Sequence, residues 1–347
     1  MRHREINAST CNLAVIAALI CCMSDVAHSN IDCPHDLNND SVVGVDDLLT
    51  VISGWGPCTP PCAADIDGSG TVGVEDLLDV VAEWGSCSTQ GTVLLFAQDL
   101  EHRSEGTYDE DMLAEDWNAP AWSGGVDDGR VSIVETDGGN KALSILYPEG
   151  EYGTSATGAQ WKVALDGSHE HIRLSYRMRF GTGFDFVRGG KLPGLIGGEG
   201  NTGGGVPDGT DGWSARMMWR SEGAAVQYVY HPDQPANYGE DLPWTRGGAA
   251  ASFLPGQWHE VVHEIRINTP GMNDGSITGW SDGKLALEAT SMRFRDVDEF
   301  AIDGMYFSTF FGGGSSSWST TKDETILFDD FRIECLDDAP FTSCDGR

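Results

Sequence analysis

The chain of 347 residues contains 54 Asp and Glu but only 21 Lys and Arg, which gives a formal net charge of −33. A chain this acidic is poorly suited to neutralising phosphates, and we expect no nucleic-acid partner. Hydrophobic residues make up 40% of the sequence, enough to form a core, and the 45 glycines indicate many turns.

The first 29 residues have the features of a bacterial-type secretory signal peptide. Residues 2–4 are basic, Leu13–Met23 is an apolar segment too short for a typical membrane span, and Ala27–Ser29 supplies small residues for cleavage. We therefore expect a secreted, extracellular protein without a membrane span after cleavage. A lipoprotein attached through Cys21 or Cys22 and a retained anchor are the alternatives.

Residues 33–87 contain an internal repeat with a period of 29 residues. Agreement over a whole unit at one spacing indicates a structural duplication. The first-unit positions Cys33, Asp36, Gly44, Asp47, Leu48, Leu49, Trp55 and Cys58 recur as Cys62, Asp65, Gly73, Asp76, Leu77, Leu78, Trp84 and Cys87.

Each repeat unit contains a twelve-residue loop of the EF-hand type, in which positions 1, 3, 5, 7 and 12 supply oxygen ligands to Ca²⁺. The first loop places Asp36, Asn38, Asp40, Val42 and Asp47 at these positions, and the second places Asp65, Asp67, Ser69, Thr71 and Asp76 there. Position 7 contributes its backbone carbonyl. We expect calcium as a structural ion and no cofactor for catalysis.

Apolar residues at i, i+3, i+4 and i+7 follow each loop and predict a helix. These residues are Val45, Leu48, Leu49 and Ile52, and then Val74, Leu77, Leu78 and Val81. A calcium loop followed by one helix, present twice, resembles a dockerin domain, the module that docks onto cohesin domains. The resemblance implies a dockerin-like domain over residues 30–88 and a cohesin-type partner.

Two features depart from that pattern. Ser41 replaces the usual glycine at position 6 of the first loop, and the final ligands are Asp instead of Glu, which predicts weaker binding in the first loop. An acidic solvated linker is the alternative to a folded module, and a purely structural role is the alternative to a docking role.

Six cysteines follow the expected signal peptide, and an even number in a secreted chain indicates disulfides. Zinc is the alternative, but no Cys-x-x-Cys pair with zinc spacing is present. The repeat and the two remaining cysteines predict the pairs Cys33–Cys58, Cys62–Cys87 and Cys335–Cys344.

Residues 89–347 show strand patterns almost throughout, separated by turns rich in Gly, Asp and Asn. So many short strands predict a mainly β domain with a single sandwich or jelly roll. The expected strands are Thr92–Phe96, Val131–Glu135, Leu143–Tyr147, Trp161–Leu165, Ile172–Phe180, Trp213–Arg220, Val226–Tyr230, Glu260–Ile267, Leu285–Ala289, Met305–Phe310 and Ile326–Glu334.

Two of these strands carry polar pairs at spacing two, Ser214 with Arg216 and Tyr228 with Tyr230, so each pair lies on one face of its strand. Ser221–Gly223 fits a three-residue hairpin loop with glycine in the left-handed position. This loop predicts that Arg216 lies opposite Tyr228 and that Ser214 lies opposite Tyr230. A four-residue loop would place the pairs on opposite faces.

The segment around this hairpin is basic, although the chain is acidic. Residues 173–220 contain seven Lys and Arg and four Asp and Glu. A locally basic strand surface indicates a site for an anionic ligand. The alternative is that these cations only pair with acidic groups of the surface.

Longer motifs extend across this domain: G-G-K-L-P-G-L at 189–195, G-W-S-A-R-M-M-W-R at 212–220, Y-V-Y-H-P-D-Q at 228–234 and F-S-T-F-F-G-G at 307–313. They resemble polysaccharide lyase family 14, the alginate and glucuronan lyases with a β-jelly-roll fold. The resemblance covers most of residues 92–335. It implies an acidic polysaccharide substrate and the catalytic residues Lys191, Ser214, Arg216, Tyr228 and Tyr230.

The implied reaction is β-elimination of a polyuronate, which needs a cation on the uronate carboxylate, a base at C5 and an acid at O4. Arg216 can grip a carboxylate bidentately and Lys191 adds a second positive charge. Tyr228 and Tyr230 are the base and acid candidates, with Tyr230 as the main proton shuttle. We expect the nearby cations to lower the tyrosine pKa, and Ser214 to bind substrate or orient a partner.

Two other functions are compatible with such a groove: a carbohydrate-binding jelly roll without turnover, and a glycoside hydrolase. A hydrolase needs two carboxylates flanking the bond, and the Glu-x-Asp-x-x-Glu strand motif is absent, because Glu135-x-Asp137 is followed by Asn140. The opposite face of the strand with Ser214 and Arg216 carries Trp213, Met217 and Trp219, which we expect to lie in the core. We interpret His259 and His263 as ordinary strand histidines and not as metal ligands.

Overall fold

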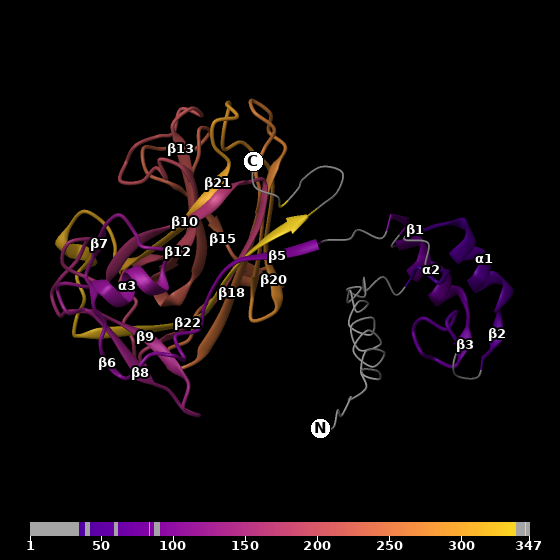
Figure 1. The fold of residues 1–347 in the computed structure, drawn as a ribbon, viewed down its shortest axis with the longest axis horizontal. Coiled ribbons are helices and arrows are strands. Elements are labelled where there is room, and N and C mark those ends of the chain that lie inside the picture. Colours follow the sequence, from indigo (N-terminus) through magenta and orange to yellow (C-terminus); the bar gives the residue numbers. More distant parts are fainter. Residues whose placement is uncertain are drawn as a thin grey trace, which may run out of the picture. The chain divides into compact units, whose positions relative to one another are not determined.

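A computed structural model describes residues 35–38, 42–58, 62–82, 84–86, 91–337 and 344. The chain forms two compact units that divide between Thr89 and Gln90 (Figure 1). The expected signal peptide, Cys33, Asp40 and Cys87 lie outside the described residues. No helix within the described ranges is long and apolar enough to cross a membrane.

The N-terminal unit contains two loop–helix repeats that exchange their strands. The helices are α1 (Val45–Ser53) and α2 (Val74–Ala82). Strand β1 (Val42–Val43) pairs with β4 (Gly85–Ser86), and β2 (Gly56–Pro57) pairs with β3 (Thr71–Val72). The segment that follows each helix therefore pairs with the loop of the other repeat.

The two helices confirm the predicted helical spacing but expose much of the apolar stripe. In α1, Val45, Leu49 and Ile52 are 60%, 53% and 48% exposed. The equivalent residues of α2 are exposed to a similar degree. The small core of this unit is formed by four valines and one alanine: Val43, Val51, Ala64, Val72 and Val80.

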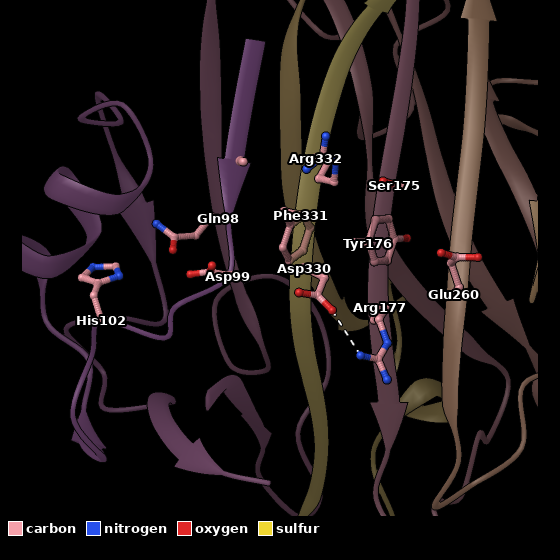
Figure 2. A pocket seen from close by; sticks show the side chains of 11 residues that line it. Gln98, Asp99, His102, Ser175, Tyr176, Arg177, Glu260, Asp330, Phe331 and Arg332 are labelled. Atoms are coloured by element: carbon pink, nitrogen blue, oxygen red, sulfur yellow. Dashed lines mark hydrogen bonds and ion pairs between the residues drawn. The ribbon is translucent and has the colours of Figure 1, made fainter. Parts of the chain in front are cut away.

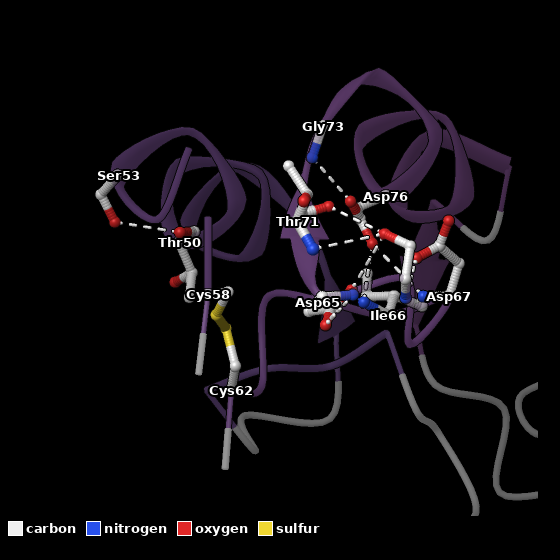
Figure 3. Close-up of a disulfide and its surroundings, with 12 residues drawn as sticks. Thr50, Ser53, Cys58, Cys62, Asp65, Ile66, Asp67, Thr71, Gly73 and Asp76 are labelled. Carbon is white, nitrogen blue, oxygen red and sulfur yellow. Dashed lines mark hydrogen bonds between the residues drawn. A yellow bond between two sulfur atoms is a disulfide. The ribbon is translucent and has the colours of Figure 1, made fainter. Parts of the chain in front are cut away.

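One disulfide of this unit differs from the prediction. Cys58 is bonded to Cys62, with the Cα atoms 6.3 Å apart (Figure 3). The expected pairs Cys33–Cys58 and Cys62–Cys87 required each repeat to close on itself. Because β2 leaves the first repeat to pair with β3 of the second, Cys58 comes to lie beside Cys62 instead. In the second unit, the predicted bridge Cys335–Cys344 is confirmed.

The second unit is a sandwich of two antiparallel sheets, as predicted. Among the described residues, one sheet has seven strands in the order β15-β14-β13-β12-β21-β10-β7, and the other has nine. The seven strands are β15 (Glu240–Pro243), β14 (Ala225–Tyr230), β13 (Gly212–Arg220), β12 (Gly189–Gly198), β21 (Ile302–Phe311), β10 (Ala159–His169) and β7 (Ser123–Gly124).

The second sheet runs in the order β20-β19-β18-β11-β22-β9-β8-β6, with β5 paired to β22. Its strands are β20 (Lys284–Met292), β19 (Gly275–Ser281), β18 (Trp258–Arg266), β11 (His171–Phe180), β22 (Glu324–Asp337), β9 (Lys141–Tyr147), β8 (Val131–Glu135), β6 (Gly106–Thr107) and β5 (Gly91–Gln98). Smaller elements are the ribbon β16 (Thr245–Arg246) with β17 (Ala249–Ala250), helix α3 (Glu110–Asp116) and the 3-10 turns Ser221–Gly223 and Ser316–Trp318.

The core lies between the two sheets and follows the alternation of each strand. In β11, buried residues alternate with partly exposed ones from Ile172 to Phe180. Large rings fill the interior, such as Trp161 stacked on Phe307 at 4.0 Å between ring centroids. All eleven predicted strands are present, and Trp213, Met217 and Trp219 are fully buried as predicted.

The sequence did not predict β12, the strand that carries Lys191. Its sequence contains five glycines and Pro193, residues that are depleted in strands. The register shifts around Pro193, which accommodates the proline as a bulge. The glycines are needed for close approach, because a Cβ at Gly190 would meet the Trp219 ring and one at Gly194 would meet the backbone of Ala215.

The predicted hairpin between β13 and β14 is confirmed with its register. Ser214 lies opposite Tyr230 and Arg216 opposite Tyr228. The turn Ser221–Gly223 has Glu222 at φ 60° and Gly223 at φ 77°, so two residues adopt the left-handed conformation. All four predicted side chains therefore belong to one face of the seven-stranded sheet.

Replacing Gly223 with alanine should destabilise this hairpin strongly, because a Cβ there would meet the Phe253 carbonyl and the Phe186 ring. Gly183 is the matched control, since its φ is 70° but a Cβ would have no neighbour within 4 Å. We expect a loss of about 1 kcal/mol for Gly183→Ala and about 3 kcal/mol for Gly223→Ala, measured by urea unfolding. Equal losses would contradict the role of close packing at this turn.

Candidate active site

The hairpin residues line a hollow of about 730 Å³ on the face of the seven-stranded sheet that points away from the core. The side chains come from β10, β12, β13, β14, β15 and β21, and glycine-rich loops form part of the rim. Its polar and aromatic lining includes Gln160, Lys191, Arg216, Arg220, Tyr228, Tyr230, Tyr238, Asp241, Tyr306 and Trp318.

Lys191 and the two tyrosines form one side of this hollow. Lys191 lies opposite Met218 in the sheet, and its Nζ atom is 2.6 Å from the Met218 sulfur. The same Nζ atom lies 3.7 Å from the centre of the Tyr228 ring, which is a cation–π contact. The Tyr228 and Tyr230 rings meet edge to face at 5.6 Å.

Arg216 lies on the other side, held by neutral groups. Its Nη1 donates to the Ser308 hydroxyl at 3.1 Å, and its guanidinium lies 5.2 Å from the Tyr306 ring centre. The Ser308 and Tyr306 hydroxyls both donate to Gln160 Oε1. Arg216 is 3% exposed, and its Nε has no hydrogen-bond partner among the described residues. A buried guanidinium with an unused donor is suited to an incoming acceptor.

Ser214 shares the sheet face with these residues but is not part of the lining. It is fully buried, and its hydroxyl donates to the Asn201 carbonyl at 2.7 Å. This bond ties the loop that follows β12 to β13. The Gly204 N–H of the same loop donates to the Tyr230 hydroxyl at 3.3 Å. Ser214 therefore positions the loop that reaches Tyr230.

Four cations near this face have no carboxylate within 4.0 Å in the described part of the chain. Their hydrogen-bond acceptors are neutral: the Glu199 carbonyl for Lys162, the Ser317 hydroxyl for Arg188, the Met218 sulfur for Lys191 and the Ser308 hydroxyl for Arg216. Arg220 differs, because it is paired with Asp241 through two bonds. On a chain of charge −33, such cations make this face the candidate site for an anionic ligand.

Burial dominates the ionisation of these groups. It lowers the pKa of Lys191 well below its usual value, and the charges of Arg216 and Arg220 lower it further. Burial raises the pKa of Tyr228, and the neighbouring Tyr230 adds to that rise, while Arg216 opposes it. The expectation that cations lower the tyrosine pKa is therefore wrong for Tyr228, because loss of hydration outweighs the attraction.

A second hollow, of about 570 Å³, lies on the nine-stranded sheet (Figure 2). Both of its arginines are paired with acids: Arg177 with Asp330 at 3.1 Å, and Arg332 with Glu334 at 2.9 Å. Its histidine, His102, contacts Asp116. These pairings leave no free positive charge in that lining, so the hollow around Arg216 is the better candidate for an anionic ligand.

In the second loop of the N-terminal unit, oxygen atoms of the predicted calcium ligands lie close together, as they do in a cation site. Ligand atoms of Asp65, Asp67 and Asp76 lie within 4.8 Å of one another (Figure 3). The Ser69 hydroxyl is 3.1 Å from the Thr71 carbonyl. All five are predicted ligands, and hard oxygen donors suit Ca²⁺. The residues present therefore fit this ion.

The final aspartates of both loops are held in the same way. Asp76 accepts hydrogen bonds from the backbone N–H groups of Ile66, Asp67 and Gly73. Asp47 accepts the same three bonds from the equivalent residues of the first repeat, Leu37, Asn38 and Gly44. Burial acts to raise the pKa of both carboxyls, yet these N–H groups outweigh it and keep the pKa below its usual value. The first loop contains the predicted ligands Asp36, Asn38 and Val42. It also includes Asp40, which lies outside the described residues, so the arrangement of this ligand set is not described.

The family model of polysaccharide lyase 14 matches residues 135–331. The chain belongs to the polysaccharide lyase 14 family. It is accordingly a polysaccharide lyase, and the binding-module and hydrolase alternatives lose their support.

Solved structures agree with this family. The alginate lyase Aly36B is 27% identical, with a TM-score of 0.61 over 69% of this chain and 95% of that one. The same enzyme has been solved as a lysine and tyrosine double mutant in complex with an alginate tetrasaccharide. The PL-14 alginate lyase from Aplysia kurodai is also 27% identical, with a TM-score of 0.59 over 70% and 98% of the two chains. No curated protein matches the chain.

The structure of this lyase adds site residues that the sequence did not predict. Gln160, Tyr306 and Ser308 support Arg216 from β10 and β21. Tyr306 and Ser308 are polar residues two positions apart on one strand, like the two pairs that the sequence analysis identified. This spacing could have predicted that they belong to the site. Gln160 had none, because its contact with Tyr306 spans 146 residues of sequence.

Both strand histidines have structural roles, as predicted. His259 contacts Asp282, and His263 is fully buried, with its Nδ1 accepting from Gln227 at 2.9 Å. Burial lowers the pKa of His263 from 6.5 to about 3. Below pH 6.5 this residue binds a proton in the unfolded chain but stays neutral in the folded protein, so lowering the pH destabilises the fold.

His263→Asn retains an acceptor for Gln227 and removes this ionisation. From pH 6 to pH 4, we expect wild type to lose about 1.4 kcal/mol per pH unit relative to the variant, measured as the difference between their unfolding free energies. A difference that stays constant with pH would show that His263 is protonated in the folded protein.

Proposed function

We propose that this lyase cleaves a polyuronate of the alginate or glucuronan type by β-elimination at the hollow around Arg216. The observation that carries the proposal is the pairing of an unused, buried guanidinium donor with two phenols on neighbouring strands. Both solved relatives at 27% identity are alginate lyases, which supports the choice of substrate class.

Arg216 binds the uronate carboxylate and neutralises its charge. Burial lowers the pKa of Lys191, and the carboxylate of the bound substrate favours the charged form of this lysine, which then adds a second positive charge. Neutralisation makes the C5 proton of the sugar removable, and Tyr230 takes that proton and delivers one to O4 as the C4–O4 bond breaks. The electron pair of the C5–H bond becomes a C4–C5 double bond, so the products are a new unsaturated end and a hydroxyl. Tyr228 remains protonated because burial raises its pKa, and it donates a hydrogen bond within the site.

The remaining parts of the chain complete the proposed protein. Residues 1–29 direct secretion, in keeping with a polysaccharide substrate outside the cell. The N-terminal unit is a dockerin-like module that binds Ca²⁺ through Asp65, Asp67, Ser69, Thr71 and Asp76 and through the matching first loop. The exposed apolar residues of α1 and α2 support docking to a cohesin-type domain.

Tyr230→Phe removes the proposed proton shuttle and retains the ring. We expect kcat to fall by about 10²- to 10⁴-fold on the preferred polyuronate, followed by the ultraviolet absorbance of unsaturated ends. Tyr152→Phe, an exposed tyrosine outside the lining, is the matched control and should retain full activity. Full activity of Tyr230→Phe would exclude this role.

Arg216→Lys tests carboxylate neutralisation separately, because a lysine keeps the charge but loses the planar fork. A fall in kcat/KM of about 10²-fold or more is expected. Unchanged kcat/KM would exclude bidentate binding by Arg216.

Calcium should stabilise the N-terminal unit without affecting catalysis. Calcium at 100 times its dissociation constant adds about 2.7 kcal/mol to the stability of a domain that it binds. We expect Asp65→Asn and Asp76→Asn to lose the calcium site of the second loop in titration calorimetry, and Glu75→Gln, an exposed acid outside the ligand set, to retain it. Absence of binding by the wild-type chain would contradict the calcium proposal, and loss of lyase activity on chelation would contradict its purely structural role.

A further inference from the structure

A smaller hollow of about 370 Å³ adjoins the reaction centre on the same face of the seven-stranded sheet. It is lined by the segment 118–122, which follows α3, and by residues of β10, β12 and β21. None of the predicted catalytic residues belongs to its lining. Its two most notable side chains are Trp122 and Lys162.

Lys162 lies between two aromatic rings. On β10 it pairs with Tyr306 of β21, and its Nζ lies 5.6 Å from the centre of that ring. On the other side, Trp161 pairs with Ser123 of β7, so the same register places Trp122 beside Lys162. Trp122 and Tyr306 meet edge to face at 6.0 Å. Tyr306 lines the reaction centre and Trp122 lines the smaller hollow, so this pair of rings joins the two sites.

The charge of Lys162 is not balanced by a carboxylate within 4.0 Å in the described ranges. Its Nζ donates to the backbone carbonyl of Glu199 at 2.6 Å. Burial lowers the pKa of Lys162, and the charge of Arg216 lowers it further. Asp303 also lines the hollow, but its carboxylate accepts hydrogen bonds from the Gly198 N–H and the Ser168 hydroxyl. A carboxylate brought by a ligand would supply the charge that Lys162 lacks.

Trp122 is presented to solvent by a constrained segment. It is 43% exposed. Two consecutive residues before it, Asn118 and Ala119, have φ values of 58° and 48°, a conformation that costs energy outside glycine. The Asn118 side chain donates to the Ala164 carbonyl of β10 at 3.2 Å, which anchors the segment to the sheet. The exposed ring is therefore held in place before any ligand arrives, which lowers the entropic cost of binding.

We propose that this hollow is a subsite for a further uronate of the polymer, in which Trp122 stacks on the apolar face of the sugar and Lys162 binds its carboxylate. The proposal rests on the proposed function, since it assigns a second contact point for the same substrate. A chain bound at Arg216 would continue past Tyr306 into the subsite. Substrates long enough to reach both sites would then bind more tightly than shorter ones.

The test compares oligouronates of increasing length with wild type, Trp122→Ala, Lys162→Met and the double variant. We expect the double variant to raise KM about tenfold for long substrates, leaving kcat and the KM of the shortest cleaved substrate unchanged. Lys162→Arg should restore KM because it retains the charge. The control is Lys284→Met, an exposed lysine at the start of β20 in the other sheet, which should behave as wild type.

Unchanged kcat on the shortest substrate also shows that the variants are folded. If the double variant retains wild-type KM at every length while wild type cleaves the polymer, the subsite is refuted and the lyase proposal stands. If wild type cleaves no polyuronate, the proposed function fails, and the subsite falls with it. Equal rises in KM for all lengths would place the effect at the reaction centre and would also refute the subsite.

Discussion

The active-site hollow depends on two cations that are buried without a countercharge. Arg216 and Lys191 are 3% and 8% exposed, and their close partners are aromatic rings, a hydroxyl and a thioether. Such partners replace only part of the hydration that burial removes. In the proposed mechanism, the carboxylate of the substrate supplies the missing countercharge.

The net charge of the whole chain makes this local arrangement necessary. A protein of charge −33 repels a polyanion at long range, although salt screens the repulsion beyond about 10 Å at 0.1 M. Binding of the proposed polyuronate therefore depends on cations that acids of the same protein do not neutralise. Most other arginines of the sandwich are paired with acids, such as Arg173 with Glu264 and Arg293 with Asp296. Most cations that line the hollow around Arg216 and the adjoining hollow around Lys162 are not paired with an acid.

Backbone geometry brings these cations together. The left-handed turn at Glu222 and Gly223 sets the register of β13 and β14, so Arg216 faces Tyr228. The glycines of β12 let that strand approach Trp219 and Ala215 closely, which brings Lys191 within reach of the Tyr228 ring. Neither feature involves the substrate. Both are conditions for the site to exist.

Local patterns in the sequence were sufficient to predict the hairpin and the eleven strands, because spacing two and turn chemistry act over a few residues, whereas the five candidate site residues came from the resemblance to the family. The same holds for the two loop–helix repeats. Contacts between distant segments decided the rest. Strand exchange between the repeats draws Cys58 away from the first repeat, and the glycines of β12 let that strand pack against Trp219 and Ala215. The raised pKa of Tyr228, the support of Arg216 by Gln160 and Ser308, and the meeting of Trp122 with Tyr306 all depend on which strands adjoin in the sheet. Adjacency and burial are properties of the packed sandwich, and no local run of sequence encodes them.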